Sequence, residues 1–221
     1  MKTILILLLT CCTWFVHAQV ESVKPSKWSV GIVFSPQYAY RFLSSDNTNQ
    51  WMVDMYDTLE KPKYGYSSGV MVDYHLGKRT SVSGGLLFSD KGERIDEVAT
   101  LRNYKNHYYF IDVPLQVNYN LYNKNLKIYV TTGLNAAVFL ANRTTYFEQN
   151  SLQEEHFSNS VKLAQLHLGG LVGLGLSSPI SSKVDFKLTF LYRQSLTKVM
   201  DSPLKRYFYS VGADMGLYYN F

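Results

Sequence analysis

Eight separate segments of the sequence alternate between apolar and small or polar side chains. Successive side chains of a β-strand point to opposite faces, so this period of two predicts strands with one apolar face. In the first segment Ile32 and Phe34 belong to the apolar set, whereas Ser35 and Gln37 belong to the polar set. The eight segments cover residues 28–42, 65–76, 81–89, 109–121, 127–140, 165–176, 184–193 and 207–221.

The connections between these segments alternate in length. The short ones are Gly77–Arg79, Tyr122–Asn125 and Ser177–Ser182, and the long ones are Leu43–Lys63, Lys91–His107, Ala141–Lys162 and Gln194–Arg206. Short turns therefore lie at one end of the strands and long loops at the other. This pattern predicts an all-β fold: an eight-stranded antiparallel transmembrane β-barrel, an up-and-down meander with short periplasmic turns and long extracellular loops.

The overall composition excludes two other classes of protein. After the first 20 residues we find no run of about 20 mostly apolar residues, the length that a membrane-spanning helix needs. Aromatic residues make up 15% and charged residues 18% of the chain, which excludes a disordered protein. A mean hydropathy of -0.13 remains compatible with a membrane barrel, because lipid-facing and interior residues cancel in the average.

A soluble lipid-binding barrel of eight strands would show the same alternation, with its apolar face turned inward. The aromatic residues favour the membrane barrel, because they gather near both ends of the strands, as interfacial belts do. The belt expected at the loop ends contains Tyr38, Tyr40, Phe42, Tyr64, Tyr66, Phe88, Tyr108, Tyr109, Phe139, Tyr192, Tyr207 and Tyr209. The belt expected at the turn ends contains Trp28, Tyr74, Tyr119, Tyr122, Tyr219 and Phe221.

The first 18 residues have the features of a secretory signal peptide. A positive start at Lys2 precedes an apolar stretch, and Ala18 offers a cleavage site. A lipoprotein signal ending before Cys11 is the alternative. We expect residues 1–18 to be removed, residues 19–27 to form a periplasmic segment and residues 28–221 to form the barrel domain. Both cysteines lie in the first 18 residues, so the mature chain has no thiol.

The last strand resembles the assembly signal of bacterial outer-membrane barrels, with alternating apolar residues that include Leu217, Tyr219 and Phe221. This resemblance implies a location in the cell outer membrane and recognition by the barrel assembly machinery. Together with Ala18-Gln19, Ile111–Leu115 and the glycine-rich sixth segment, it makes the chain similar to the PorT-type outer-membrane β-barrel family. That family includes secretion-system assembly factors and proteins without an assigned role, so the resemblance implies no particular activity.

The polar face of the strands carries charges of both signs. An eight-stranded barrel is filled by its own side chains, and buried charges need partners. We therefore expect an interior polar network rather than a wide channel, with a narrow gated path for protons or solutes as the alternative. Its expected members are Arg41, Asp73, Asp112, Lys127, Asp185, Lys187, Arg193 and Asp214, with His75 beside them.

The sequence contains few residue patterns that are typical of catalytic or metal-binding sites. The histidines are scattered without the spacing of metal ligands, so we expect no metal, no cofactor and no catalytic residue. One enzyme alternative is a lipid A-type ester hydrolase. His156 and Ser158 on the third long loop, with Glu154 and Glu155 before them, would supply its base, hydroxyl and orienting acid.

Apolar residues in the long loops suggest a structural or partner-binding role of the scaffold, adhesion or secretion-accessory type. The alternative is that they pack against one another as a cap. The positive charges form no dense stripe, so we expect no nucleic acid and instead expect contact with outer-membrane lipid and an envelope protein. The candidate residues are Trp51, Met52, Met55, Tyr56, Phe147 and Phe157.

Overall fold

The computed structural model describes most of the chain beyond its first 26 residues. The predicted signal peptide and nearly all of the predicted periplasmic segment lie outside the described residues. The described ranges are 27–45, 49–95, 104–123, 126–148, 151–155, 165–201 and 204–221.

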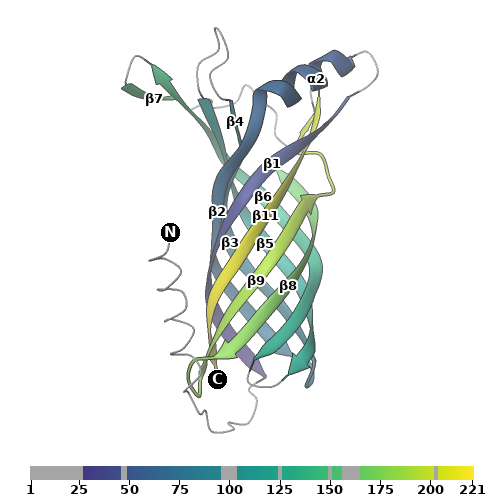
Figure 1. The fold of residues 1–221 in the computed structure, drawn as a ribbon, viewed down its shortest axis with the longest axis vertical. Coiled ribbons are helices and arrows are strands. Elements are labelled where there is room, and N and C mark those ends of the chain that lie inside the picture. Colours follow the sequence, from purple (N-terminus) through teal and green to yellow (C-terminus); the bar gives the residue numbers. More distant parts are fainter. Residues whose placement is uncertain are drawn as a thin grey trace, which may run out of the picture.

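Eight long strands form a closed antiparallel ring (Figure 1). Each strand pairs with the next one along the chain, and β1 closes the ring by pairing with β11 from Ser29↔Asn220 to Ser44↔Lys205. The ring confirms the predicted eight-stranded meander. The strands are β1 (Trp28–Ser44), β2 (Glu60–His75), β3 (Thr80–Lys91), β5 (Tyr104–Asn123), β6 (Lys127–Glu148), β8 (Leu166–Pro179), β9 (Val184–Ser195) and β11 (Lys205–Asn220).

Both faces of the wall follow the predicted alternation. In β1, Ile32 is 73% exposed whereas Ser35 is fully buried. Interior glycines make room for interior rings, because a Cβ atom on Gly31 would lie 2.6 Å from the ring of Tyr218. A Cβ atom on Gly175, in the glycine-rich strand β8, would likewise lie too close to the ring of Tyr129. Gly31 and Gly175 thus allow the rings of Tyr218 and Tyr129 to occupy the lumen.

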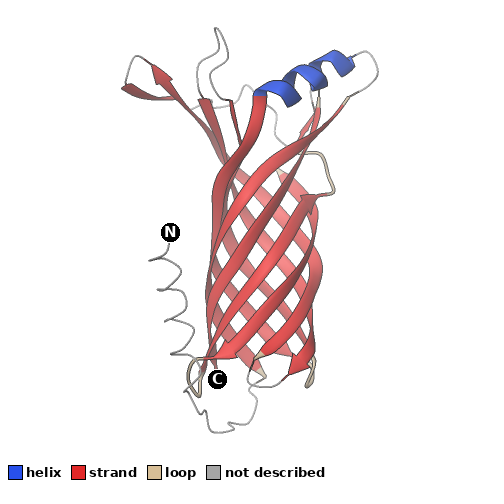
Figure 2. Ribbon diagram, in the orientation of Figure 1, coloured by secondary structure: helices blue, strands red, loops and turns tan. Residues whose placement is uncertain are grey.

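The strands extend further at the loop end than the sequence predicted. Residues 43–63, 91–107, 141–162 and 194–206 were expected to be loops, but β2 begins at Glu60, β5 begins at Tyr104 and β6 continues to Glu148. That expectation was wrong because the apolar alternation fades where a strand leaves the lipid, while backbone pairing continues. The additional elements at this end are α2 (Gln50–Leu59), β4 (Glu93–Ile95), β7 (Ser151–Glu155) and β10 (Met200–Asp201) (Figure 2).

Helix α2 lies at the loop end, between β1 and β2. Its sequence contains no glycine or proline, and Met52, Val53 and Tyr56 recur at helical spacing. Val53 is buried against Leu43 and Leu204. No helix within the described ranges is long and apolar enough to cross a membrane.

Two residues predicted for the outer aromatic belt lie inside the barrel. Tyr108 is only 6% exposed, and Phe139 packs against the buried cluster that contains Phe110 and Phe208. The prediction was wrong for these two because each lies beside outward-facing residues: Tyr108 precedes Tyr109, and Phe139 lies between the exposed Val138 and Leu140. Adjacent strand residues point to opposite faces, so the period of two already required Tyr108 to face inward.

Candidate functional site

Three ion pairs line the lumen, two between non-adjacent strands and one between the neighbouring strands β9 and β11. Lys187 donates a hydrogen bond to Asp73, whose side chain is 1% exposed. Arg193 Nη2 lies 2.7 Å from both carboxylate oxygens of Asp214. Nearer the turns, Lys127 Nζ lies 4.0 Å from Asp185. Six of the eight residues expected in the interior network are therefore partners of one another.

Asp112 is the centre of a second interior cluster. Lys91 Nζ donates to its two oxygens at 3.0 and 2.8 Å, and Asn135 donates at 2.9 Å. Ser89 also donates to Asp112 and contacts Ser67 at 2.7 Å. Lys91 was not predicted in the network, because it was expected in a loop. The alternation of β3, continued by two residues beyond Ser89, places Lys91 on the inward face.

Aromatic and aliphatic side chains fill the lumen towards the loop end. Phe110 is 1% exposed, and its ring centroid lies 5.7 Å from that of Phe139 and 6.2 Å from that of Phe208. Val199, from the connection between β9 and β11, belongs to the same cluster. The interior therefore contains an apolar layer that was not predicted from the sequence.

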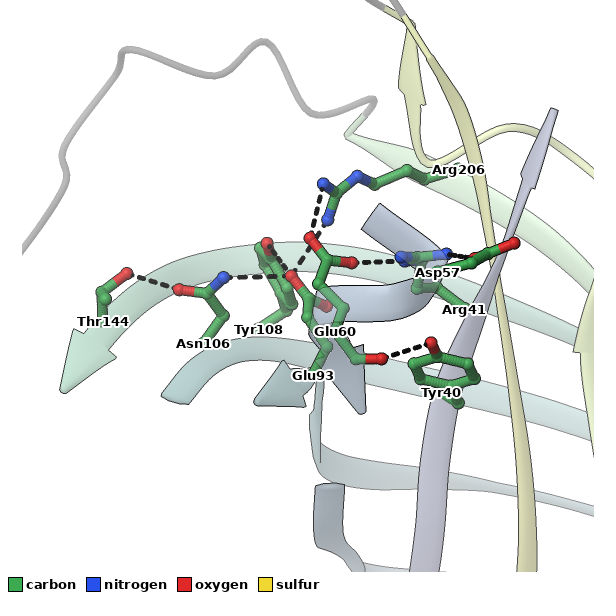
Figure 3. A network of polar contacts seen from close by, with 9 residues as sticks. All are labelled: Tyr40, Arg41, Asp57, Glu60, Glu93, Asn106, Tyr108, Thr144 and Arg206. Carbon is green, nitrogen blue, oxygen red and sulfur yellow. Dashed lines mark hydrogen bonds and ion pairs between the residues drawn. The ribbon is translucent and has the colours of Figure 1, made fainter. Parts of the chain in front are cut away.

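A third polar cluster closes the loop end (Figure 3). Arg206 lies 3.1 Å from Glu60 and 3.0 Å from Glu93, and Arg41 pairs with Glu60. Tyr108 Oη donates to Glu93 at 3.0 Å. Arg41 was expected in the network, but Glu60, Glu93 and Arg206 were assigned to loops and so were missed.

Glu93 is fully buried in this cluster. It lies in β4, beyond the outer aromatic belt. Burial raises the pKa of Glu93 above its usual value, and the neighbouring Glu60 adds to the rise while Arg206 opposes it. The cluster therefore favours the protonated form of this carboxyl group more than water does.

An ion pair connects helix α2 to the same polar cluster. Arg41 Nη1 lies 2.5 Å from Asp57 of the helix, and Met52 and Tyr56 pack partly against the apolar cluster around Val53. Trp51 and Met55, in contrast, are 62% and 40% exposed. The side chain of Phe147 and all of Phe157 lie outside what the structure describes. Of the six predicted contact residues, two thus cap the barrel and two remain accessible.

Two small cavities lie among the interior side chains. The cavity beside Asp73, Lys187 and Asp214 measures about 20 Å³, and that beside Lys91, His167 and Arg193 about 30 Å³. A cavity needs roughly 10–15 Å³ to hold a single water molecule. Each of these two volumes accommodates an isolated water molecule.

Among the described residues, no group of three or more His, Cys, Asp or Glu side chains could hold a metal ion. His75 lies 3.3 Å from Ser29 and His107 lies 2.9 Å from Asp90, so both are parts of interior or rim contacts. His156 and Ser158, the residues of the hydrolase alternative, lie outside the described residues.

A closed ring of strands with an apolar outer wall and an ion-paired interior defines an integral β-barrel membrane protein. Residues 17–201 match the family described as outer membrane protein beta-barrel domain. The chain belongs to this family, and its location is the outer membrane. The short turns accordingly face the periplasm and the long loops face outward. The narrower PorT-type membership stays a prediction.

Solved structures of outer-membrane proteins resemble this fold at low sequence identity. Neisserial surface protein A is 15% identical, with 90% of this chain and all of that chain covered and a TM-score of 0.47. OprG from Pseudomonas aeruginosa is 12% identical, with 92% and 100% covered and a TM-score of 0.44. Ail, the attachment invasion locus protein of Yersinia pestis, is 13% identical, with 87% and 99% covered and a TM-score of 0.38. No curated protein matches the chain significantly.

Proposed function

We propose that this outer-membrane barrel is a structural or partner-binding protein that acts through its extracellular end. The observation that carries the proposal is the anchoring of α2, which leaves Trp51 and Met55 accessible on a fixed support. Large apolar side chains exposed on a rigid element are typical of contact sites. An envelope protein is the expected partner, in a scaffold, adhesion or secretion-accessory role.

Site-specific photo-crosslinking in intact cells tests this role. A photoreactive amino acid at Trp51 or Met55 should give one discrete crosslinked protein, because these side chains would lie in the contact. The same probe at Asp54, an exposed polar position of α2, is the matched control. Crosslinks of equal yield at all three positions, or at none of them, would contradict a specific contact.

A narrow gated pore is the second candidate, since the lumen contains many charged groups. The ion pair between Lys187 and Asp73 and the layer around Phe110 support a closed barrel instead. Single-channel recording of the purified barrel should show no steady conductance. Steady conductance that changes in the Lys187→Ala or Asp185→Ala variant, with heat-resistant folding intact, would favour the pore.

The lipid A-type ester hydrolase remains a candidate only through His156 and Ser158. No described contact supports it, and ester hydrolysis of this kind requires the base and the hydroxyl to be held within hydrogen-bonding distance of each other. Mass spectra of lipid A from cells that overproduce the protein should equal those from control cells. Loss of an acyl chain that requires Ser158 would establish the enzyme.

A further inference from the structure

The larger of the two interior cavities, of about 30 Å³, is lined by residues of β3, β6, β8, β9 and β11. Lys91 and Arg193 both line it, and no Asp or Glu is among its described lining residues. The cavity of about 20 Å³ nearer the turns differs in this respect, because Asp73 and Asp214 line it. We call the larger one the basic cavity.

Small residues at inward positions make room for the basic cavity. Gly169 of β8 pairs in register with Ser195 of β9, and Ser210 of β11 pairs with Arg193. All four residues line the cavity. Three neighbouring positions with little or no side chain therefore leave space beside the guanidinium group.

Arg193 has hydrogen-bonding capacity beyond its ion pair. Its side chain is 9% exposed, and Nη2 donates to both carboxylate oxygens of Asp214 at 2.7 Å. Nη1 is buried and has no hydrogen-bond acceptor among the residues that the structure describes. A guanidinium group stays charged and carries five N–H donors, and a buried donor without an acceptor is costly. Nη1 therefore needs an acceptor that the described side chains do not supply.

His167 adds a second donor at the same cavity. Its side chain is 2% exposed, and its ring lies against the ring of Phe110 at 5.7 Å between centroids. The backbone of Lys198 lies beside this ring, but within the described part of the chain no hydrogen bond of normal geometry reaches either ring nitrogen. A neutral imidazole carries one N–H donor and an imidazolium carries two. His167 can therefore donate to a group in the cavity.

The acids that pair with the two cations lie outside the cavity lining. Lys91 donates to both oxygens of Asp112, and Arg193 pairs with Asp214, but neither aspartate lines the basic cavity. The cavity is thus surrounded by cationic and N–H groups, with the compensating carboxylates behind them. A buried anion requires this kind of surrounding, because it loses its hydration when it leaves water.

We propose that the basic cavity binds one small monovalent anion of the halide type. Arg193 Nη1 and a ring N–H of His167 are the donors, and Lys91 adds positive potential. The volume is roughly twice the 10–15 Å³ that one water molecule needs, so a halide fits, whereas phosphate with its four oxygens does not. This site lies inside the wall and is independent of the proposed partner contact at α2.

Crystals of the full barrel grown with sodium bromide provide a direct test, because bromide scatters X-rays anomalously. One anomalous peak should lie in the basic cavity, in contact with Arg193 and His167. Arg193→Lys keeps a cation for Asp214 but lacks the second guanidinium nitrogen, and His167→Leu removes the ring donors, so the peak should be lost in both variants. Thr189→Ser, at the cavity nearer the turns, is the matched control and should keep the peak. Water in place of bromide in the unaltered protein, or a peak that persists in both variants, would overturn the proposal.

Urea unfolding in lipid vesicles tests the same site in solution. Chloride at ten times its dissociation constant should raise the ratio of folded to unfolded protein about tenfold, because only the folded barrel contains the cavity. The Thr189→Ser variant should respond in the same way, whereas Arg193→Lys and His167→Leu should not. Heat-resistant gel migration verifies that each variant is folded. An equal response to chloride in all four proteins would overturn the proposal, because the salt would then act on exposed charges.

Discussion

Lys187 of β9 donates a hydrogen bond to Asp73 of β2 across the lumen, although the two strands are not neighbours in the wall. The same ammonium group lies 4.1 Å from the ring centroid of Tyr218. The pair therefore ties opposite parts of the ring together and occupies the lumen between them. Loss of this ion pair should therefore lower the stability of the barrel and leave space in its lumen.

Replacement of Lys187 by methionine should strongly destabilise the barrel. Asp73 would remain buried without its cation, a situation that costs about 3–5 kcal/mol. Urea unfolding in lipid vesicles measures this loss, and Lys183→Met, at an exposed turn position, is the control. Adding Asp73→Asn to Lys187→Met should cost less than the two single losses summed, because the two residues interact. Strict additivity would show that the pair contributes nothing.

The interior aromatic layer should contribute far more to stability than aromatic residues on the outer wall. Phe110→Ala should lower the free energy of unfolding by about 3–5 kcal/mol, since it leaves a cavity beside Phe139 and Phe208. Phe190→Ala removes the same side chain from a position that is 57% exposed, so its effect should be smaller. Equal losses in the two variants would mean that Phe110 is not packed as the structure shows.

The stability of the extracellular cap should depend on pH through Glu93. The folded-state pKa of Glu93 is raised by burial, so folding takes up a proton and is favoured at low pH. This contribution is complete below the usual value of about 4.5 and is lost as the pH rises through the raised value. Thermal unfolding followed by tryptophan fluorescence should therefore show a melting temperature that decreases as the pH rises from about 4.5 through the raised pKa of Glu93.

The Glu93→Gln variant isolates this effect. Glutamine keeps the size of the side chain and cannot ionise, so the fall in melting temperature above pH 4.5 should become shallower. Asp54→Asn, at an exposed position of α2, should leave the pH profile unchanged. An identical profile in the unaltered protein and the Glu93→Gln variant would assign the dependence to another group.

Phe221 should matter for assembly more than for stability. Its side chain is 73% exposed, and its ring contacts only the neighbouring Tyr219 among the ring pairs described, at 5.3 Å between centroids. If the barrel assembly machinery recognises this residue, Phe221→Ala should reduce the amount of folded barrel in outer membranes. Leu86→Ala, at a 61% exposed mid-strand position, is the control. Unfolding of the refolded Phe221→Ala protein should be nearly unchanged, and a large loss there would point to a structural role.

Local features of the chain could be predicted because they depend on neighbouring residues alone. The alternation of Ile32 and Phe34 with Ser35 and Gln37 specified a strand and both of its faces. The spacing of the turns specified the order of the strands. The same rule, applied one residue further, would have placed Tyr108 in the lumen.

Other features depend on groups far apart in the chain. The cluster of Arg41, Glu60, Glu93 and Arg206 draws on four strands and forms where the apolar alternation has already faded. Helix α2 was missed because its ten residues give a helical period too short to stand out from a polar loop. Neither feature leaves a period-two signal in the sequence.

The amino-acid sequence alone was enough to predict an outer-membrane barrel, the number of its strands and the outward face of most strand residues, with Tyr108 and Phe139 as exceptions. Those properties follow from the period of two and from the lengths of the connections. The contact of Asp73 with Lys187, at a separation of 114 residues, and the pairing of Arg41 and Arg206 with the same carboxylate of Glu60 are visible only in the folded barrel. These contacts depend on ring closure, because the tilt and register of the paired strands set which side chains lie at the same height in the barrel. No single strand contains that information.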